Sequence, residues 1–447
     1  MKYHIGIVSL GCSKNLVDTE VMLGLLHQHG FAITNEESLA DVLIINTCGF
    51  IETAKQESIN NILELAQYKE TGKCKLLVVT GCLAERYQNQ ILEEIPEVDA
   101  VVGTGNYHEI ADVIDKTFEG SQMLKVGNAD YTPVEGLPRI QSTPSYTAYL
   151  KIADGCDNHC TYCIIPKLRG RYRSRKMEDI LTEARKMADN GVREFIIIAQ
   201  DTSKYGEDLY GSIALPTLLI KLSEIEKIKW IRIHYCYPES ITNELIDTIK
   251  VQPKICNYLD IPIQHCNDEI LKRMGRRGRQ KELYALIERL RKSVRDISIR
   301  TSIIVGFPGE TGEAFDELEQ FVKQVRFDRM GVFTYSREED TPAAQYDNQI
   351  DEQVKKDRYE RLMETQANIS LKINQDKIGS TLEVLIEGYD AHTKRYYGRT
   401  YADSIDIDGK IFIHSAKQLA PGTFINVTVT SAQQYDLIGE IQNESCK

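Results

Sequence analysis

The sequence lacks any apolar run long enough to cross a membrane. A membrane helix needs about 18 or more consecutive apolar residues, and no such run occurs among the 447 residues. The N-terminus opens with the strand-like residues 3–8 and lacks the charged and apolar regions of an export signal. We therefore expect a cytoplasmic protein that neither spans a membrane nor is exported.

Positive charge is also scarce. The chain has 54 Lys and Arg against 66 Asp and Glu, a formal net charge of −12. This balance argues against a protein that coats nucleic acid and favours a basic partner, although a local basic patch can override it. A composition of 42% hydrophobic and 27% charged residues is typical of a globular protein. At roughly 150 residues per domain, the length predicts about three domains.

A disulfide framework is not expected either. The chain has 11 cysteines, an odd number, and no export signal, so a reducing compartment is the natural setting. Thiols in that setting act as metal ligands, redox groups or small buried apolar side chains.

The apolar pattern predicts an α/β protein of several domains. Residues 1–118 alternate apolar runs with amphipathic stretches, which predicts an open parallel α/β sheet. Residues 119–141, rich in Gly and Pro, are interpreted as a linker. Residues 142–376 contain six strand–helix repeats and predict a partial (β/α)6 barrel, whose site should lie at the carboxyl ends of its strands. Residues 377–447 are typical of a small antiparallel β-barrel of the OB type. The strands are predicted at residues 3–9, 42–46, 75–80 and 100–102, and then at 146–152, 194–200, 229–235, 257–263, 299–305 and 330–335.

Three cysteines form a Cys-x3-Cys-x2-Cys pattern at the end of the first predicted barrel strand: Cys156, Cys160 and Cys163. Three thiolates on one short loop can hold three irons of a 4Fe-4S cluster and leave the fourth iron without a protein ligand. A structural zinc site is the alternative, but it needs a fourth ligand. His159 is the nearest candidate, and it lies inside the loop where chelation would be strained.

A second set consists of Cys12, Cys48 and Cys82, each of which directly follows a predicted strand of the first domain. The ends of parallel strands converge on one crevice, and each cysteine precedes a helix whose N-terminal dipole favours a thiolate. We predict a second three-ligand cluster here; buried structural cysteines are the alternative. The other cysteines show no ligand spacing and are expected to be inert: Cys74, Cys236, Cys256, Cys266 and Cys446.

The barrel cysteine pattern, with Tyr162 before the last Cys, resembles the signature of radical S-adenosylmethionine enzymes. The resemblance implies that the methionyl group of S-adenosylmethionine chelates the open iron and that a 5′-deoxyadenosyl radical abstracts a substrate hydrogen. The Gly-Phe-Pro-Gly-Glu-Thr run at residues 306–311 resembles the same group. Tyr162, Gln200 and Asp201 are the expected cofactor-binding residues, with a turn or capping role as the alternative for Gln200 and Asp201. No catalytic acid or base can be singled out.

Two cysteine sets followed by a small β-barrel resemble the methylthiotransferases over essentially the whole chain. In that family the first cluster handles the sulfur, and the last module is called TRAM. Residues 9–20, Ser-Leu-Gly-Cys-Ser-Lys-Asn-Leu-Val-Asp-Thr-Glu, resemble the branch that methylthiolates the β-carbon of an aspartate in small-subunit ribosomal protein S-twelve. Residues 200–206 and 261–266 resemble this branch too. The tRNA-modifying relatives of the MiaB type, which usually carry Gln-Met-Asn after the first Cys, are the alternative.

The resemblance implies that an electron donor and a sulfur donor act as partners. Residues 377–447 contain 7 basic and 9 acidic residues, which leaves little charge for RNA phosphates. This acidic balance favours a domain that docks a basic ribosomal protein. The alternative is that the domain is a structural cap with no role in substrate binding. Because all six proposed ligands lie upstream, we expect cleavage of S-adenosylmethionine not to depend on this module. A non-enzymatic iron-sulfur carrier is disfavoured, because it needs neither open irons nor a barrel.

Two basic clusters keep the tRNA alternative open. The favoured interpretation is that they neutralise anionic clusters, hold a carboxylate or form a solvated face, because a substrate aspartate and a methionyl carboxylate both need cationic partners. The clusters consist of Arg169, Arg171, Arg173, Arg175 and Lys176, and of Lys272, Arg273, Arg276, Arg277, Arg279 and Lys281.

Overall fold

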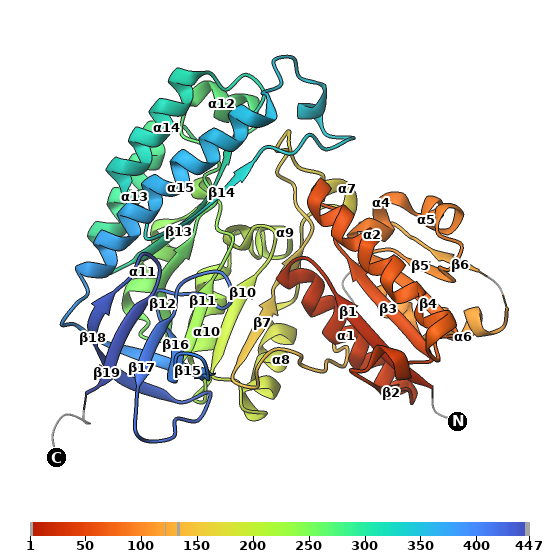
Figure 1. Cartoon of the computed structure of the whole chain (residues 1–447). Coiled ribbons are helices and arrows are strands. Elements are labelled where there is room, and N and C mark those ends of the chain that lie inside the picture. The colour runs from red at the N-terminus through yellow and green to blue at the C-terminus, as the bar shows by residue number, and fades with distance from the viewer. Residues whose placement is uncertain (1–2, 121, 132–134, 443–447) are drawn as a thin grey trace.

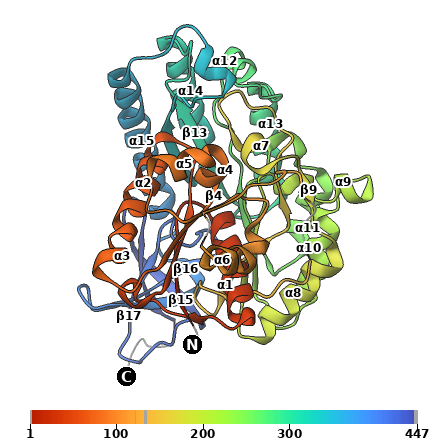
Figure 2. The ribbon, with the colours of Figure 1, turned by 90° about the vertical axis from the view of Figure 1, so that its right-hand side faces the viewer.

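The computed structural model describes residues 3–120, 122–131 and 135–442. Three parts are packed together: an N-terminal α/β domain, a central parallel barrel, and a small C-terminal barrel below it (Figure 1). Figure 2, turned by 90°, shows the N-terminal domain lying across the central barrel. Within the described part of the chain, no helix has the length and apolar character required to span a membrane.

The N-terminal domain is an open, fully parallel sheet in the order β2-β1-β3-β4-β5-β6. Apolar clusters cover both of its faces, as the continuous apolar strands require. The predicted linker contributes the edge strand β6. The strands are β1 His4–Ser9, β2 Ala32–Ile33, β3 Val42–Thr47, β4 Leu76–Gly81, β5 Ala100–Val102 and β6 Met123–Lys125. The helices are α1 Ser13–His29, α2 Glu52–Ala66, α3 Tyr68–Thr71, α4 Cys82–Tyr87, α5 Asn89–Glu94 and α6 Ile110–Phe118.

The central domain is a curved sheet of six parallel strands in the order β14-β13-β12-β11-β10-β7, which confirms the predicted partial barrel. Its main core fills the layer between the strands and the outer helices. The strands are β7 Thr147–Lys151, β8 Ala153–Asp154, β9 Arg173–Ser174, β10 Glu194–Ile198, β11 Trp230–Ile233, β12 Ile255–Asp260, β13 Ser298–Val305 and β14 Arg329–Thr334. The helices are α7 Ile165–Arg169, α8 Met177–Asp189, α9 Glu207–Tyr210, α10 Leu215–Ser223, α11 Asn243–Val251, α12 Asp268–Arg273, α13 Gln280–Ser293, α14 Gly312–Val325 and α15 Glu352–Gln375.

The C-terminal domain is a closed five-stranded barrel in the order β15-β16-β17-β19-β18, as predicted. One pairing, β17 with β19, is parallel, and the others are antiparallel. Its own small apolar core fills the interior. The strands are β15 Thr381–Asp390, β16 Arg395–Thr400, β17 Ile411–His414, β18 Phe424–Ala432 and β19 Leu437–Ile441.

Residues 399–408, at the end of β16 and in the following loop, close the end of the central barrel where its strands begin; we call this segment the barrel plug. Asp403 pairs with Arg329, the first residue of β14, at 2.5 Å. Asp408 accepts a hydrogen bond from the hydroxyl of Tyr258 at 2.8 Å. Ile405 is buried with apolar side chains of the barrel wall. Some of the acidic side chains of the C-terminal domain therefore bind the central barrel and are not available to a partner.

Glu194, the first residue of β10, is fully buried between two guanidinium groups at the barrel plug. Its Oε2 lies 2.6 Å from Arg399 and its Oε1 lies 3.1 Å from Arg232. Burial opposes ionisation, but Arg399 and Arg232 outweigh it and lower the pKa of Glu194 from 4.5 to about 2. A carboxyl with a depressed pKa stabilises the fold above its unfolded pKa. This contribution is therefore complete at neutral pH and is lost as the pH falls from about 4.5 towards 2.

Several contacts fix the N-terminal domain on the central barrel, among them an apolar cluster and a group of ion pairs. Val17 of α1 shares an apolar cluster with Ile198 of β10 and with Ile405 of the barrel plug. The loop after β14 makes the second contact, where Glu338 pairs with Arg86 at 3.0 Å and Lys55 at 3.2 Å. These contacts hold the carboxyl edge of the N-terminal sheet against the carboxyl end of the barrel.

Candidate active site

The first cysteine set lies at the carboxyl edge of the N-terminal sheet. Cys12 follows β1 and is the N-cap residue of α1, Cys48 follows β3, and Cys82 follows β4 as the first residue of α4. These three strands are neighbours in one parallel sheet, so their ends bring three distant parts of the chain to one crevice.

Two residues shape the space around this set. The side-chain nitrogen of Asn15 donates to the backbone carbonyl of Leu10, near Cys12, at 3.1 Å and to that of Thr47, next to Cys48, at 2.9 Å. The side-chain oxygen of Asn15 lies 3.8 Å from the sulfur of Cys82. Gly11 precedes Cys12 with φ of +86°, and a Cβ atom there would lie 3.2 Å from the sulfur of Cys48. Glycine is the residue that adopts this conformation without strain, and it leaves the space beside that sulfur free.

The three thiols of this set influence one another. Burial is the main cause that raises the pKa of Cys82 to about 12; the guanidinium of Arg169 opposes the shift, and the thiols of Cys12 and Cys48 add to it. Burial also raises the pKa of Cys48. Metal binding displaces the protons of such thiols, so the set suits a resident metal group better than a free reactive thiolate.

The second cysteine set lies in the loop between β8 and α7, at the carboxyl end of the barrel. Cys156 and Cys160 are buried, and Cys163 is half-buried. The sulfur of Cys160 lies 3.4 Å from the hydroxyl of Tyr237 and 4.0 Å from a guanidinium nitrogen of Arg276. Burial raises the pKa of Cys156 to about 11. Arg276 thus provides a positive charge next to a proposed ligand of an anionic group.

The donor chemistry of both sets fits an iron-sulfur cluster. Among the residues that the structure describes, no three His, Cys, Asp or Glu side chains converge on a point that would hold a single metal ion. A cubane does not require such convergence, because each thiolate binds its own iron. Each set offers three thiols, which matches a cluster with one open iron.

The two sequence features that resemble radical enzymes contact each other. The ring of Tyr162 packs edge-on against the ring of Phe307, with 6.4 Å between the centroids. Phe307 belongs to the predicted segment 306–311, which follows β13. The cysteine loop is thereby supported by the strand end on the far side of the barrel.

Gln200 and Asp201 follow β10 and lie under the cysteine loop. Gln200 donates to Asp154 at 2.8 Å, and its side-chain oxygen is buried without a hydrogen-bond partner in the described residues. Asp201 accepts hydrogen bonds from Asn158 at 3.1 Å and from Ser203 at 2.5 Å. Asp201 therefore anchors the cysteine loop through Asn158, while the free oxygen of Gln200 is available to a ligand.

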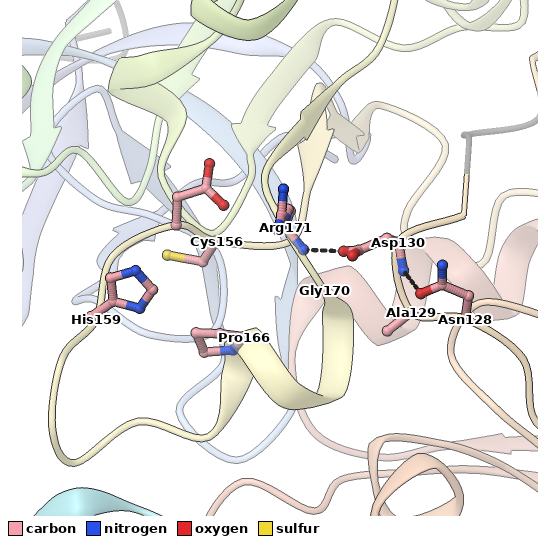
Figure 3. A pocket seen from close by; sticks show the side chains of 9 residues that line it. Asn128, Ala129, Asp130, Cys156, His159, Pro166, Gly170 and Arg171 are labelled. Carbon is pink, nitrogen blue, oxygen red and sulfur yellow. Dashed lines mark hydrogen bonds between the residues drawn. The ribbon is translucent and has the colours of Figure 1, made fainter.

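A cavity of about 510 Å³ lies beside the second set (Figure 3). Cys156 and His159 line one side, and Asp130 lies on the other, where it accepts a hydrogen bond from the backbone of Arg171 at 2.6 Å. Its lining consists of Asn128, Ala129, Asp130, Cys156, Asp157, His159, Pro166, Gly170 and Arg171. One proposed ligand thus faces an open space.

A buried charge network joins the two sets. Arg169, from α7 beside the barrel set, pairs with Asp18 of α1 at 2.9 Å and with Asp154 at 3.1 Å. Its other nitrogen donates to Asn15 at 2.5 Å. Lys151 pairs with both Asp18 and Asp154. Arg169, which the sequence analysis considered as a possible phosphate contact, is only 3% exposed and serves this internal network.

Lys14, in the first turn of α1, is 5% exposed. Its Nζ lies 3.0 Å from the centroid of the Tyr235 ring, a cation–π contact at the carboxyl end of β11. Burial lowers the pKa of Lys14 to about 8, while Cys12 and Asp260 oppose the shift. Nothing in the sequence pattern indicated a role for Lys14 in the site.

Family models match three parts of the chain. Residues 150–322 match the radical SAM superfamily, residues 378–441 match the TRAM domain, and residues 4–103 match an uncharacterized protein family, UPF0004. Together with the parallel barrel and its cysteine loop, these matches define the class: a radical S-adenosylmethionine enzyme that carries an added α/β domain and a TRAM barrel.

Full-length relatives narrow this class to one family. The chain is 54% identical over 435 residues to the ribosomal protein uS12 methylthiotransferase RimO of Lachnoclostridium phytofermentans, which covers 97% of this chain and 99% of the relative. It is 51% identical over 447 residues to the RimO protein of Clostridium botulinum, with 100% of both chains covered. The chain belongs to the RimO family of radical S-adenosylmethionine methylthiotransferases. The alternative of a MiaB-type enzyme is not favoured.

A solved structure supports the fold alone. The radical S-adenosylmethionine methyltransferase TsrM of Kitasatospora setae, with cobalamin and a 4Fe-4S cluster bound, superposes with a TM-score of 0.56 at 13% identity. The match covers 85% of this chain and 79% of that chain.

Proposed function

We propose that this enzyme inserts a methylthio group at the β-carbon of an aspartate in small-subunit ribosomal protein uS12. The observation that carries the proposal is the placement of two three-cysteine sets at the carboxyl end of one barrel, joined by the buried network of Arg169, Lys151, Asp18 and Asp154. The RimO relatives act on this ribosomal protein by name. Because the proposed substrate belongs to the ribosome, the enzyme would work in the cytoplasm.

In this proposal Cys156, Cys160 and Cys163 hold a 4Fe-4S cluster whose open iron takes S-adenosylmethionine. When bound, this pair supplies the 5′-deoxyadenosyl radical that abstracts a hydrogen from the substrate. The chain contributes position and exclusion of water. Tyr162, Gln200 and Asp201 are proposed as cofactor-site residues, since they support or flank the cysteine loop.

Cys12, Cys48 and Cys82 would hold a second 4Fe-4S cluster, which handles the sulfur to be inserted. Arg169 supports this role, because its guanidinium lies close enough to lower the pKa of Cys48 and Cys82 against the effect of burial. A cation in that position would also offset the negative charge of a thiolate-bound cluster. An electron donor and a sulfur donor are the further partners that this chemistry needs.

The proposed domains are an N-terminal methylthiotransferase domain at 1–118, a linker at 119–141 whose strand β6 extends the N-terminal sheet, the radical domain at 142–376 and the TRAM domain at 377–447. The barrel plug gives the TRAM domain a structural role, which is the alternative that the sequence analysis kept beside substrate docking.

The test of the substrate is a product assay. Reconstituted enzyme is offered uS12 and unmodified tRNA under reducing, anaerobic conditions with S-adenosylmethionine and sulfide. We expect mass spectrometry to find a methylthio group on one aspartate of uS12 and none on tRNA. Methylthioadenosine in the tRNA with unmodified uS12 would contradict the proposal.

Replacing Cys12, Cys48 and Cys82 together by Ala is expected to uncouple the two halves of the chemistry. Radical generation needs only the barrel set, so the variant should still form 5′-deoxyadenosine but no methylthio product. The measurement is chromatography of both products from the same reaction. Cys74→Ala is the matched control, because Cys74 is buried in the core of the same domain and should leave both products unchanged. Methylthio product at the parental rate would reassign the three cysteines as structural.

A further inference from the structure

The ammonium of Lys14 is buried without a counter-ion. Within the described residues it has no hydrogen-bond or ion-pair partner, and its Nζ lies 3.0 Å from the centroid of the Tyr235 ring. A buried charge is costly unless it is paired, and a cation–π contact offsets only part of that cost. The site is therefore electrostatically incomplete and favours an anion.

The two carboxylates of the described residues that influence Lys14, Asp260 and Asp154, are each already held by another cation. Asp260 pairs with Arg300 at 3.1 Å and accepts a hydrogen bond from the backbone of Tyr235 at 3.1 Å. Asp154 pairs with Lys151 and Arg169, both at 3.1 Å. In the part of the chain that the structure describes, the ammonium of Lys14 therefore has no carboxylate partner, and a ligand can pair with it.

The position of Lys14 indicates what the ligand does. Lys14 lies two residues after Cys12 of the first set, on α1, and its Nζ stands over Tyr235 at the carboxyl end of β11. The substrate carbon that accepts the methylthio group must reach both the first cysteine set, which is proposed to handle the sulfur, and the barrel set, which is proposed to generate the radical. A carboxylate one bond away from that carbon would lie in the same region as Lys14.

We infer that Lys14 binds a carboxylate, and we assign it to the side-chain carboxylate of the substrate aspartate, which makes Lys14 a specificity-determining residue. The assignment rests on the proposed function. The methionyl carboxylate of S-adenosylmethionine is the other possible source of this chemistry. It has a cation of its own at the barrel set, because Arg276 lies 4.0 Å from the sulfur of Cys160 and its Nε is buried without a hydrogen-bond partner among the described residues.

The test compares two substrates on the intact, reconstituted enzyme: uS12, and uS12 in which the target aspartate is replaced by Asn. A hydrogen bond to a charged group typically increases the binding affinity by roughly ten- to a hundredfold. We expect the parent enzyme to bind the Asp form about tenfold or more tightly than the Asn form. Lys14→Met, an apolar side chain of similar length, should bind both forms equally and should lose most kcat/KM for the Asp form. Lys14→Arg should restore part of the preference.

One control and three further outcomes make the result decisive. Lys73→Met, at an exposed lysine of the same domain, is the matched control and should keep the preference for Asp. An intact Asp preference in Lys14→Met together with a raised KM for S-adenosylmethionine would overturn the assignment in favour of the methionyl carboxylate. Equal losses for both substrates, or loss of iron in Lys14→Met, would show that Lys14 serves the cluster instead. Modification of tRNA alone by the parent enzyme would instead refute the proposed function. That outcome is measured separately, in the product assay that offers both uS12 and unmodified tRNA.

Discussion

Replacing Cys156, Cys160 and Cys163 together by Ala is expected to abolish cleavage of S-adenosylmethionine and to remove about half of the iron. Two cubane clusters hold about eight irons, and a protein that keeps only the N-terminal set should hold about four. Cleavage should fall to the background of free cluster, because the open iron that binds the methionyl group is gone. The fold should survive, since the loop is also fixed by hydrogen bonds such as that from Asn158 to Asp201 at 3.1 Å.

The measurement combines iron and sulfide analysis with an assay for 5′-deoxyadenosine on anaerobically reconstituted protein. Cys256→Ala is the matched control, because Cys256 is a buried barrel cysteine, packed with Trp230 and Tyr258, away from both sets. It should keep both iron and activity. Retention of full iron content in the triple variant, or zinc in place of iron, would refute the two-cluster assignment.

Removing residues 377–447 is expected to disable the enzyme as a whole. The sequence alone predicts that cleavage of S-adenosylmethionine does not depend on this domain, because no proposed ligand lies in it. The structure gives the opposite expectation, because truncation removes Arg399 from Glu194 and Asp403 from Arg329, two pairs that are at most 5% exposed. Breaking one buried pair costs about 3–5 kcal/mol, and a domain is stable by only about 5–15 kcal/mol.

The truncated protein should therefore melt at a lower temperature or aggregate, and 5′-deoxyadenosine formation should be lost with the fold. Because a truncation can fail for many reasons, Arg399→Met in the full chain is the sharper variant. It should lower the free energy of unfolding by about 3 kcal/mol. Lys394→Met, at an exposed residue of the turn between β15 and β16 in the same domain, is the control. Unchanged melting and activity in Arg399→Met would show that the barrel plug contributes little.

Local pattern was sufficient to predict the parallel sheets and the position of the cysteines. Apolar runs such as 42–46 and 75–80 are short, continuous and β-branched, so they mark buried parallel strands, and Cys48 and Cys82 follow them in the structure. The short strand β6 was missed because residues 123–125 lie among glycines and prolines. It adds to the sheet through pairing with β5, which no local pattern reveals.

Buried polar residues were beyond the reach of the sequence. Glu194 and Arg399 are separated by 205 positions, and nothing near either residue indicates the other. Lys14 and Asp18 have the spacing of a solvated helix face, yet both are at most 5% exposed, because α1 packs against the central barrel. The spacing of charged residues therefore predicts a solvent-exposed helix face correctly only where no second domain packs against that face.

The barrel plug has a consequence for the order in which the protein is made. Domains of a growing chain generally fold in the order of their synthesis. Here Val17, near the start of the chain, shares an apolar cluster with Ile405, near its end, and His234 of the barrel wall meets Ser404 at 2.9 Å. A nascent chain that stops short of these residues has both cysteine sets but lacks the C-terminal share of the contacts that hold the two domains together. The packing between the domains is thus completed only after the last domain has been made.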